Sequence, residues 1–276
     1  MSTRRQAQKE FARLVKESGD ELPLDWAVTW IAVDEEPELD PKDPIKGLDE
    51  LAASIHIPAT TQIFEKIARI NYHLFDQLDF RGDERKYDEP HNSLIHRVLQ
   101  RRRGLPILLS LIYIEVARRL DVRIDGIGFP GHFLVSPHDV EPRFFIDPFR
   151  KGAILREDFL RMRMRQIFAP KQMRTDQEER MLKPVNNRQL MVRVNNNLKG
   201  SYMKRNNLYA ALRAVDRLIL LEPEWVEQIR DRGLILIGLD RQDEGIRELR
   251  NYLNANPAAA DADHIRKRMA ELASAE

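Results

Sequence analysis

The side chains best suited to chemistry are a histidine and an aspartate near the middle of the chain, His132 and Asp147. They lie in two short strand-like segments, residues 132–135 and 143–147, separated by the Pro, Asp and Ser residues typical of turns. A histidine oriented by a carboxylate can activate a hydroxyl or thiol nucleophile. The chain contains no cysteine, which excludes a thiol nucleophile, a thiolate metal site and a disulfide bond.

An almost wholly apolar helix precedes these strands. Pro106 suits the first position of a helix, where its missing N–H would have had no partner. Residues 107–116 then carry polar side-chain atoms only at Ser110, Tyr113 and Glu115. Such a helix should be buried in the core of the protein. It is too short, and too closely flanked by arginines, to span a bilayer.

Three motifs give the chain a specific resemblance: Gly104-Leu105-Pro106 with Leu109-Ser110, Phe129-Pro130-Gly131-His132-Phe133-Leu134, and Ile146-Asp147-Pro148-Phe149. With the order of a buried helix followed by antiparallel strands, they resemble a bacterial family often labelled SirB-type regulators. That family joins a transglutaminase-like core to tetratricopeptide repeats, and the resemblance covers nearly the whole chain. It implies an α+β, mainly helical fold: a papain/transglutaminase-like core with a small antiparallel sheet, then an α-helical tetratricopeptide-repeat segment.

The resemblance also implies roles for individual residues. In such a core a cysteine at the start of the central helix is activated by a histidine that an aspartate orients. His132 and Asp147 match the last two positions, and Pro106 stands at the position of the nucleophile. Because proline offers neither a nucleophile nor an N–H, the resemblance implies an inherited loss and no catalytic residue. Asp121 and Lys151 depart from the family pattern, since glycine is usual at both positions.

Ser110 is the alternative nucleophile, with His132 and Asp147, for an atypical hydrolase or acyltransferase. It lies one turn further along the helix, so its hydroxyl would have to reach His132 from inside the helix and away from the dipole end. The competing interpretation is that His132 and Asp147 form a hydrogen-bonded pair that joins two strands without chemistry. An open cleft around His132 would favour the enzyme, and a filled one the binding module.

A 34-residue period organises the last third of the chain. Pro223 and Pro257 are one period apart, as are Ala211 and Gly245, and these are the helix-stopping and small-residue positions of a tetratricopeptide repeat. We expect helix pairs at 188–204 with 208–221 and at 225–238 with 243–255, followed by a capping helix at 261–275.

The first helices of such repeats line a concave surface that binds an extended partner. On this register the predicted peptide-binding residues are Arg193, Asn196, Asn197, Lys204 and Arg230. Their cationic and hydrogen-bonding groups suit a peptide backbone or a carboxylate. The alternative is a polar outer face that binds nothing.

We expect two domains, residues 1–183 with a helical front section and residues 184–276 with the repeats. Helical periodicity predicts front helices at 4–18, 25–33, 48–55 and 61–78. Residues 171–184 are the predicted linker, and residues 157–168 a helix before it. In a helix its arginines, at positions 161, 163 and 165, would not share a face, so we predict them to be ordinary surface side chains whose stems lie along apolar surface.

Arginines also end the helix predicted at 93–102, which Asn92 would cap: Arg97, Arg101, Arg102 and Arg103. Arginines at a helix C-terminus suit the helix dipole, and an anion site is the alternative.

Composition excludes several classes of function. With 45 Lys and Arg against 44 Asp and Glu, a general nucleic-acid binder is not expected. Gly126 to Gly131 match G-x-G-x-x-G, but Pro130 removes a donor and a strand follows where a nucleotide site needs a helix. The histidines show no metal-binding spacing, so neither a metal nor a cofactor is expected. The first residues lack the apolar region of a signal peptide. These features predict a cytoplasmic, non-catalytic module that binds a protein or peptide through its repeats, and leave its oligomeric state open.

Overall fold

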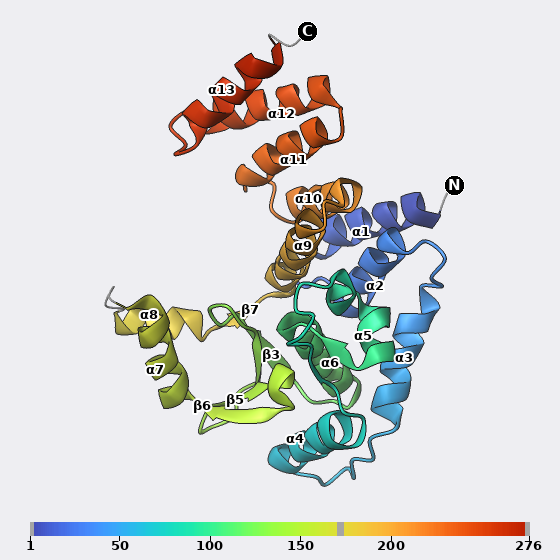
Figure 1. The fold of residues 1–276 in the computed structure, drawn as a ribbon. Coiled ribbons are helices and arrows are strands. Elements are labelled where there is room, and N and C mark those ends of the chain that lie inside the picture. Colours follow the sequence, from blue (N-terminus) through green and yellow to red (C-terminus); the bar gives the residue numbers. More distant parts are fainter. Residues whose placement is uncertain (1–2, 170–173, 274–276) are drawn as a thin grey trace. The chain divides into compact units, whose positions relative to one another are not determined.

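The computed structural model describes residues 3–169 and 174–273. It confirms a mainly helical α+β fold with a small antiparallel sheet (Figure 1). The chain divides into two compact units, Met1–Val194 and Asn195–Glu276, here called the first and second units. The domain boundary predicted from the sequence, between residues 183 and 184, precedes this division.

The front section of the first unit is helical, as predicted. Its helices are α1 Thr3–Ser18, α2 Leu24–Glu35, α3 Lys42–Ala53 and α4 Ile63–Asn71, which continues as the π-helical segment η1 Tyr72–Gln77. Helix α2 is buried along most of its length, whereas α1 buries one stripe that includes Phe11 and Leu14. The amphipathic stripe is what makes a surface helix pack on a core.

Helix α6 Pro106–Arg119 is the buried central helix that the sequence predicts. It follows the 3₁₀ turn η2 Pro90–Ser93 and the short helix α5 Ile95–Arg101. The prediction that Asn92 caps this short helix is wrong, because Asn92 lies in the preceding turn. There its Nδ2 donates to the carbonyl of Lys86 at 2.7 Å, and its Oδ1 accepts from Arg101 at 3.0 Å.

Five short strands form an antiparallel sheet in the order β6-β5-β4-β3-β7. They are β3 Ile124–Ile127, β4 Leu134–Pro137, β5 Phe144–Asp147, β6 Ala153–Arg156 and β7 Pro184–Val185, while β1 Arg81–Gly82 and β2 Arg103–Gly104 pair in parallel elsewhere. The prediction that His132 belongs to a strand is wrong by two residues, since β4 begins at Leu134 and His132 lies in the turn from β3. The glycine-rich motif, residues 126–131, runs from the end of β3 into that turn, so it joins two strands and opens no helix.

Helix α7 Glu157–Phe168 lies against one face of this sheet (Figure 1), where Leu160 and Met164 pack with Phe145 of β5. Helix α8 Thr175–Met181 follows, so part of the predicted linker is a helix; residues 171–173 of that linker lie outside the described residues.

A buried carboxylate joins α7 to α8. Glu178 accepts hydrogen bonds from Arg165 Nε at 2.6 Å and from Arg161 Nη1 at 3.4 Å. Hydrogen bonding to Arg165 lowers the pKa of Glu178 below its usual value. The prediction that these two arginines do not share a helix face is wrong, because residues four apart lie on the same face. The third of them, Arg163, is exposed and donates to Gln166.

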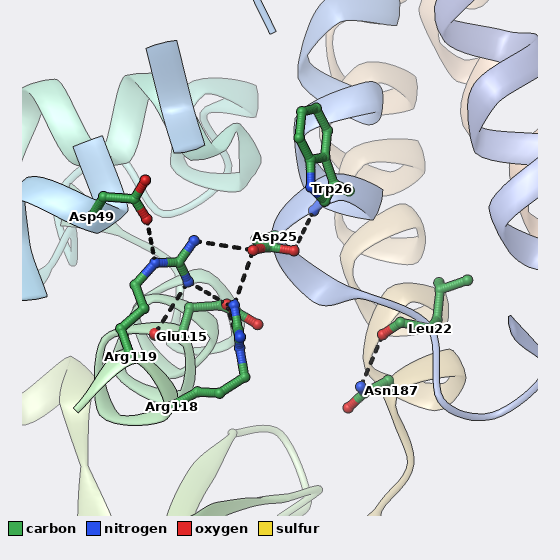
Figure 2. A network of polar contacts seen from close by, with 8 residues as sticks. All are labelled: Leu22, Asp25, Trp26, Asp49, Glu115, Arg118, Arg119 and Asn187. Carbon is green, nitrogen blue, oxygen red and sulfur yellow. Dashed lines mark hydrogen bonds and ion pairs between the residues drawn. The ribbon is translucent and has the colours of Figure 1, made fainter. Parts of the chain in front are cut away.

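Two buried carboxylates, Glu115 of α6 and Asp25 of α2, are bridged by arginines at the end of α6 (Figure 2). Glu115 Oε2 accepts from Arg118 Nη2 at 2.8 Å and from Arg119, and Asp25 Oδ2 accepts from both arginines at 3.0 Å. Arg119 also reaches the exposed Asp49 at 2.7 Å. The polar residue near the end of the apolar helix therefore anchors that end to the front section.

The second unit is built from helices at the predicted positions. Helix α9 Asn187–Lys204 crosses the division between the units, and α10 Leu208–Leu221, α11 Glu227–Gly238, α12 Gln242–Ala255 and α13 Ala262–Ala273 follow. Helices α11 and α12 pack closely at Gly233 and Gly245: a Cβ on Gly245 would lie 2.7 Å from the carbonyl oxygen of Gly233. The small residue at this repeat position is therefore required by helix packing. Of the predicted capping helix, residues 274 and 275 lie outside the described residues.

Candidate functional site

His132 and Asp147 are hydrogen-bonded to each other, with 2.9 Å between Nε2 and Oδ1. Asp147 ends β5 and caps the 3₁₀ turn η3 Pro148–Arg150, where its Oδ1 also accepts from the amides of Phe149 at 3.1 Å and Arg150 at 3.2 Å. Only 3% of Asp147 is exposed. A carboxylate acceptor requires the proton on Nε2 of a neutral His132, which leaves Nδ1 as the basic nitrogen. Nδ1 makes no hydrogen bond to any residue that the structure describes.

The turn that carries His132 is held by an arginine from the start of α9. Arg193 donates from Nη2 to the carbonyl of Gly128 at 3.0 Å and from Nη1 to the carbonyl of His132 at 3.2 Å. Its guanidinium lies over the ring of Phe133, and burial lowers its pKa. The sequence predicted Arg193 on a peptide-binding face, whereas the structure places its guanidinium on this turn. The ring of Phe149 meets the His132 ring edge to face, with 5.7 Å between centroids.

Both side-chain hydroxyl groups of α6 are buried. Ser110 is fully buried and donates to the carbonyl of Phe133 at 3.4 Å. Tyr113 is also fully buried, stacks on Phe75, and has a pKa raised by burial. Pro106 is buried at the first position of the helix. Among the described residues, no serine, threonine or tyrosine hydroxyl is hydrogen-bonded to His132.

His132 lines neither of two cavities formed by described residues of the first unit. One, of about 670 Å³, has a largely apolar wall formed by α4, β5 and β6. The other, of about 710 Å³, is lined by β1, Arg103 and residues that follow Asp147. Within the same residues, no group of three or more carboxylates and histidines is arranged to hold a metal ion.

The predicted peptide-binding residues of the repeats have unequal environments. Asn196 and Asn197 are half-buried on α9, and Lys204 is exposed at its last position. Arg230 is engaged within the second unit, where its guanidinium contacts Asp231 and Asp261 at 2.7 Å each. Arg193 and Arg230 therefore have intramolecular roles that the repeat register did not reveal.

Comparisons with known proteins agree with this architecture. The model of the transglutaminase-like superfamily matches residues 43–196, and a tetratricopeptide-repeat model matches residues 198–270. A UPF0162 protein of Xylella fastidiosa is 33% identical over 259 residues, covering 92% of this chain and 91% of that protein. Protein SirB1 of Salmonella typhimurium is 26% identical over 210 residues, which are 76% of each chain.

The chain belongs to the SirB-type, transglutaminase-like family. A shorter similarity links the mouse F-box only protein 21 to this SirB-type chain, with 42% identity over 91 residues, or 30% of this chain and 14% of that protein. No solved structure matches it. None of the helices among residues 3–169 and 174–273 has the length and apolar character needed to cross a membrane.

Two departures from the SirB-type pattern have a common backbone explanation. Asp121 and Lys151 both adopt a left-handed conformation, each with φ of +54°. Glycine enters this region at no steric cost, which agrees with the glycine that the resemblance leads us to expect at both positions. At the second position the side chain gains a contact that glycine could not make, because Lys151 Nζ lies 2.7 Å from Asp79 Oδ1.

Sequence reasoning missed Arg193, Phe149 and the two backbone amides as parts of this site. The sequence Asp147-Pro148 could have predicted the hydrogen bonds from the two amides, because aspartate favours the N-cap position and proline the first helical position. The ring contact of Phe149 and the hydrogen bonds of Arg193 to backbone carbonyls correspond to no pattern in the sequence, so neither residue could be predicted in this way.

Proposed function

We propose that this SirB-type protein is a non-catalytic protein- or peptide-binding module with a regulatory role. The tetratricopeptide segment binds the partner, and the transglutaminase-like core serves as a scaffold without a nucleophile. Repeats of this kind present a concave surface to extended partners. The balanced charge of the chain favours a protein over a nucleic acid. The proposal includes the cytoplasmic location predicted from the sequence.

The position of the missing nucleophile carries this proposal. Pro106 begins the central helix where the related cores hold a cysteine, and the whole sequence contains no cysteine. The alternative nucleophile, Ser110, has no exposed surface, and its hydroxyl donates a hydrogen bond to the backbone carbonyl of Phe133. A buried hydroxyl already bonded to the backbone is poorly placed for attack on a substrate.

The proposal is tested by partner capture with matched asparagine variants. Asn196→Ala with Asn197→Ala changes the first helix of a repeat, and Asn251→Ala with Asn254→Ala changes exposed positions of α12. Binding partners are captured with the full-length protein, identified, and mapped to peptides. We expect the first pair to weaken binding of the mapped peptide and the second to leave it unchanged. The exposed pair on α12 should keep its free energy of unfolding within about ±0.5 kcal/mol, and binding by the half-buried Asn196 and Asn197 pair is measured at a temperature where both variants remain folded.

Equal binding by both double variants, or equal loss in both, would contradict a peptide site on the first helices.

An atypical hydrolase or acyltransferase that uses Ser110, His132 and Asp147 is the second candidate. The bond between His132 and Asp147, which leaves Nδ1 unbonded, favours it. Fluorophosphonate probes test it directly, and our proposal expects no labelling of Ser110. In the converse experiment, Pro106→Cys restores a thiol at the helix start, where the dipole and an imidazole should lower its pKa. We expect rapid alkylation near neutral pH that slows when His132→Ala is added; stoichiometric labelling of Ser110 would instead establish the enzyme.

A further inference from the structure

A cavity of about 710 Å³ on the first unit is lined mostly by charged side chains. Its residues come from β1 and the chain after it, from β2, and from the turn after Asp147. The basic members are Arg81, Arg85, Arg103, Arg150 and Lys151. This set is called the basic cavity below. All of its lining residues belong to the first unit, whereas the proposed peptide site is assigned to the repeats, so this inference does not rest on the proposed function.

One carboxylate at the edge of the basic cavity shows how closely its cations converge. Asp79 contacts Lys151 Nζ at 2.7 Å, Arg103 Nη2 at 2.8 Å and Arg81 Nη1 at 3.5 Å. The hydrogen bonds from Lys151 and Arg103 lower the pKa of Asp79 to about 2. A position where three cations meet one exposed carboxylate has a strongly positive potential.

Two cations of the basic cavity are not neutralised by this carboxylate. Arg85 makes no hydrogen bond or ion pair with the residues that the structure describes. Arg150 has a side chain that is 68% exposed, and its Nε lies 3.9 Å from Asp147 Oδ2. The lining side chains and their ion-pair partners comprise six basic groups and four carboxylates. This excess of two positive charges exceeds the net charge of +1 of the whole chain.

An aromatic ring forms another wall of the basic cavity. Phe149 lies so close to Gly82 that a Cβ there would be 2.3 Å from its ring. The same ring contacts Tyr87 and His132 edge to face, at 6.1 Å and 5.7 Å between centroids. The glycine therefore lets the ring lie against β1, and the same ring lines the basic cavity and contacts His132.

We propose that the basic cavity binds a small dianionic ligand, a phosphorylated compound or a dicarboxylate, through Arg85 and Arg150. Guanidinium groups suit both, because their planar forks match the oxygens of phosphate and carboxylate. Two positive charges in excess match two negative charges on the ligand. Since Phe149 touches both the cavity and His132, binding should change the NMR signals of the His132 ring.

The test is an NMR and calorimetric titration of the full-length protein with inorganic phosphate, succinate and, as a monoanion control, chloride. We expect saturable binding of phosphate or succinate, with a shift of the His132 ring signals, and no saturable binding of chloride. Binding of phosphate alone identifies a phosphoryl ligand, and binding of succinate alone a dicarboxylate.

Matched variants separate a site from general charge attraction. Arg85→Gln with Arg150→Gln should weaken binding at least about tenfold, because both charge-assisted contacts are lost. Arg5→Gln with Arg163→Gln removes the same charge from exposed positions elsewhere and should leave binding unchanged. If the first pair lowers the melting temperature, Arg85→Gln alone should still weaken binding.

No saturable binding of phosphate or succinate by the wild type, or equal weakening by both double variants, would overturn the proposal.

Discussion

Replacing Asp147 with alanine should destabilise the first unit markedly, whatever the protein binds. The carboxylate accepts three hydrogen bonds, from His132 and from the amides of Phe149 and Arg150, and is 3% exposed. Loss of an N-cap costs about 0.5–2 kcal/mol, and loss of the bond from His132 about 0.5–1.5 kcal/mol. Orphaned buried donors add to this, so the expected decrease in the free energy of unfolding is about 2–4 kcal/mol.

Chemical denaturation and calorimetry measure this decrease. For a unit of this size each kcal/mol lowers the melting temperature by about 2–4 °C, so Asp147→Ala should melt about 5–15 °C lower. Asp147→Asn keeps an Oδ1 acceptor and loses only the charge, so it should cost about 1 kcal/mol. A double-mutant cycle with His132→Ala should give a coupling of about 0.5–1.5 kcal/mol. A loss below about 1 kcal/mol for Asp147→Ala, or equal losses for both substitutions, would refute this account of the pair.

Two further predictions concern the ionic networks. Glu115→Gln should cost about 2–3 kcal/mol in urea denaturation, less than a wholly buried pair because Arg118 is 58% exposed. Asp49→Asn, at the exposed end of the same network, should cost less than about 1 kcal/mol. Because the pKa of Asp79 is lowered to about 2, its ion pairs should stabilise the fold above its unfolded pKa and be lost as pH falls toward 2. Carboxyl NMR should show Asp79 titrating near pH 2, and Lys151→Met should raise that midpoint; an unchanged midpoint would exclude Lys151 as its cause.

The helices were the most predictable part of the fold. The apolar segment after Pro106 strongly favours a buried helix. The helix predicted at 208–221 begins and ends at the same residues as α10. In the repeats, the 34-residue period predicts prolines where helices end and small residues where helices pack closely. Gly233 and Gly245 show such close packing. In these segments local propensity and tertiary packing favour the same structure.

The contacts that hold the candidate site were much less predictable. Asparagine is a common helix cap, yet the side-chain amide of Asn92 instead donates to the carbonyl of Lys86 and accepts from Arg101. Arg193 and Arg230 sit at repeat positions that suit a ligand, but each finds partners that no periodicity encodes. Helix α8 is only seven residues long, and the buried Glu178 that fixes it is paired with arginines of another helix. Long-range pairing depends on the folded arrangement, so spacing along the chain does not reveal it.

The clamp on the His132 turn has a consequence for the order in which the protein is made. Gly128 and His132 leave the ribosome well before Arg193, whose guanidinium binds both of their carbonyls. The turn therefore gains these two hydrogen bonds only after the first two turns of α9 have emerged. A fragment that stops at Lys183 would retain every strand of the sheet except β7, but its turn would lack the two hydrogen bonds that Arg193 donates. During translation, the hydrogen bonds that hold this turn thus form only after α9, the helix that leads into the repeats, has begun to emerge.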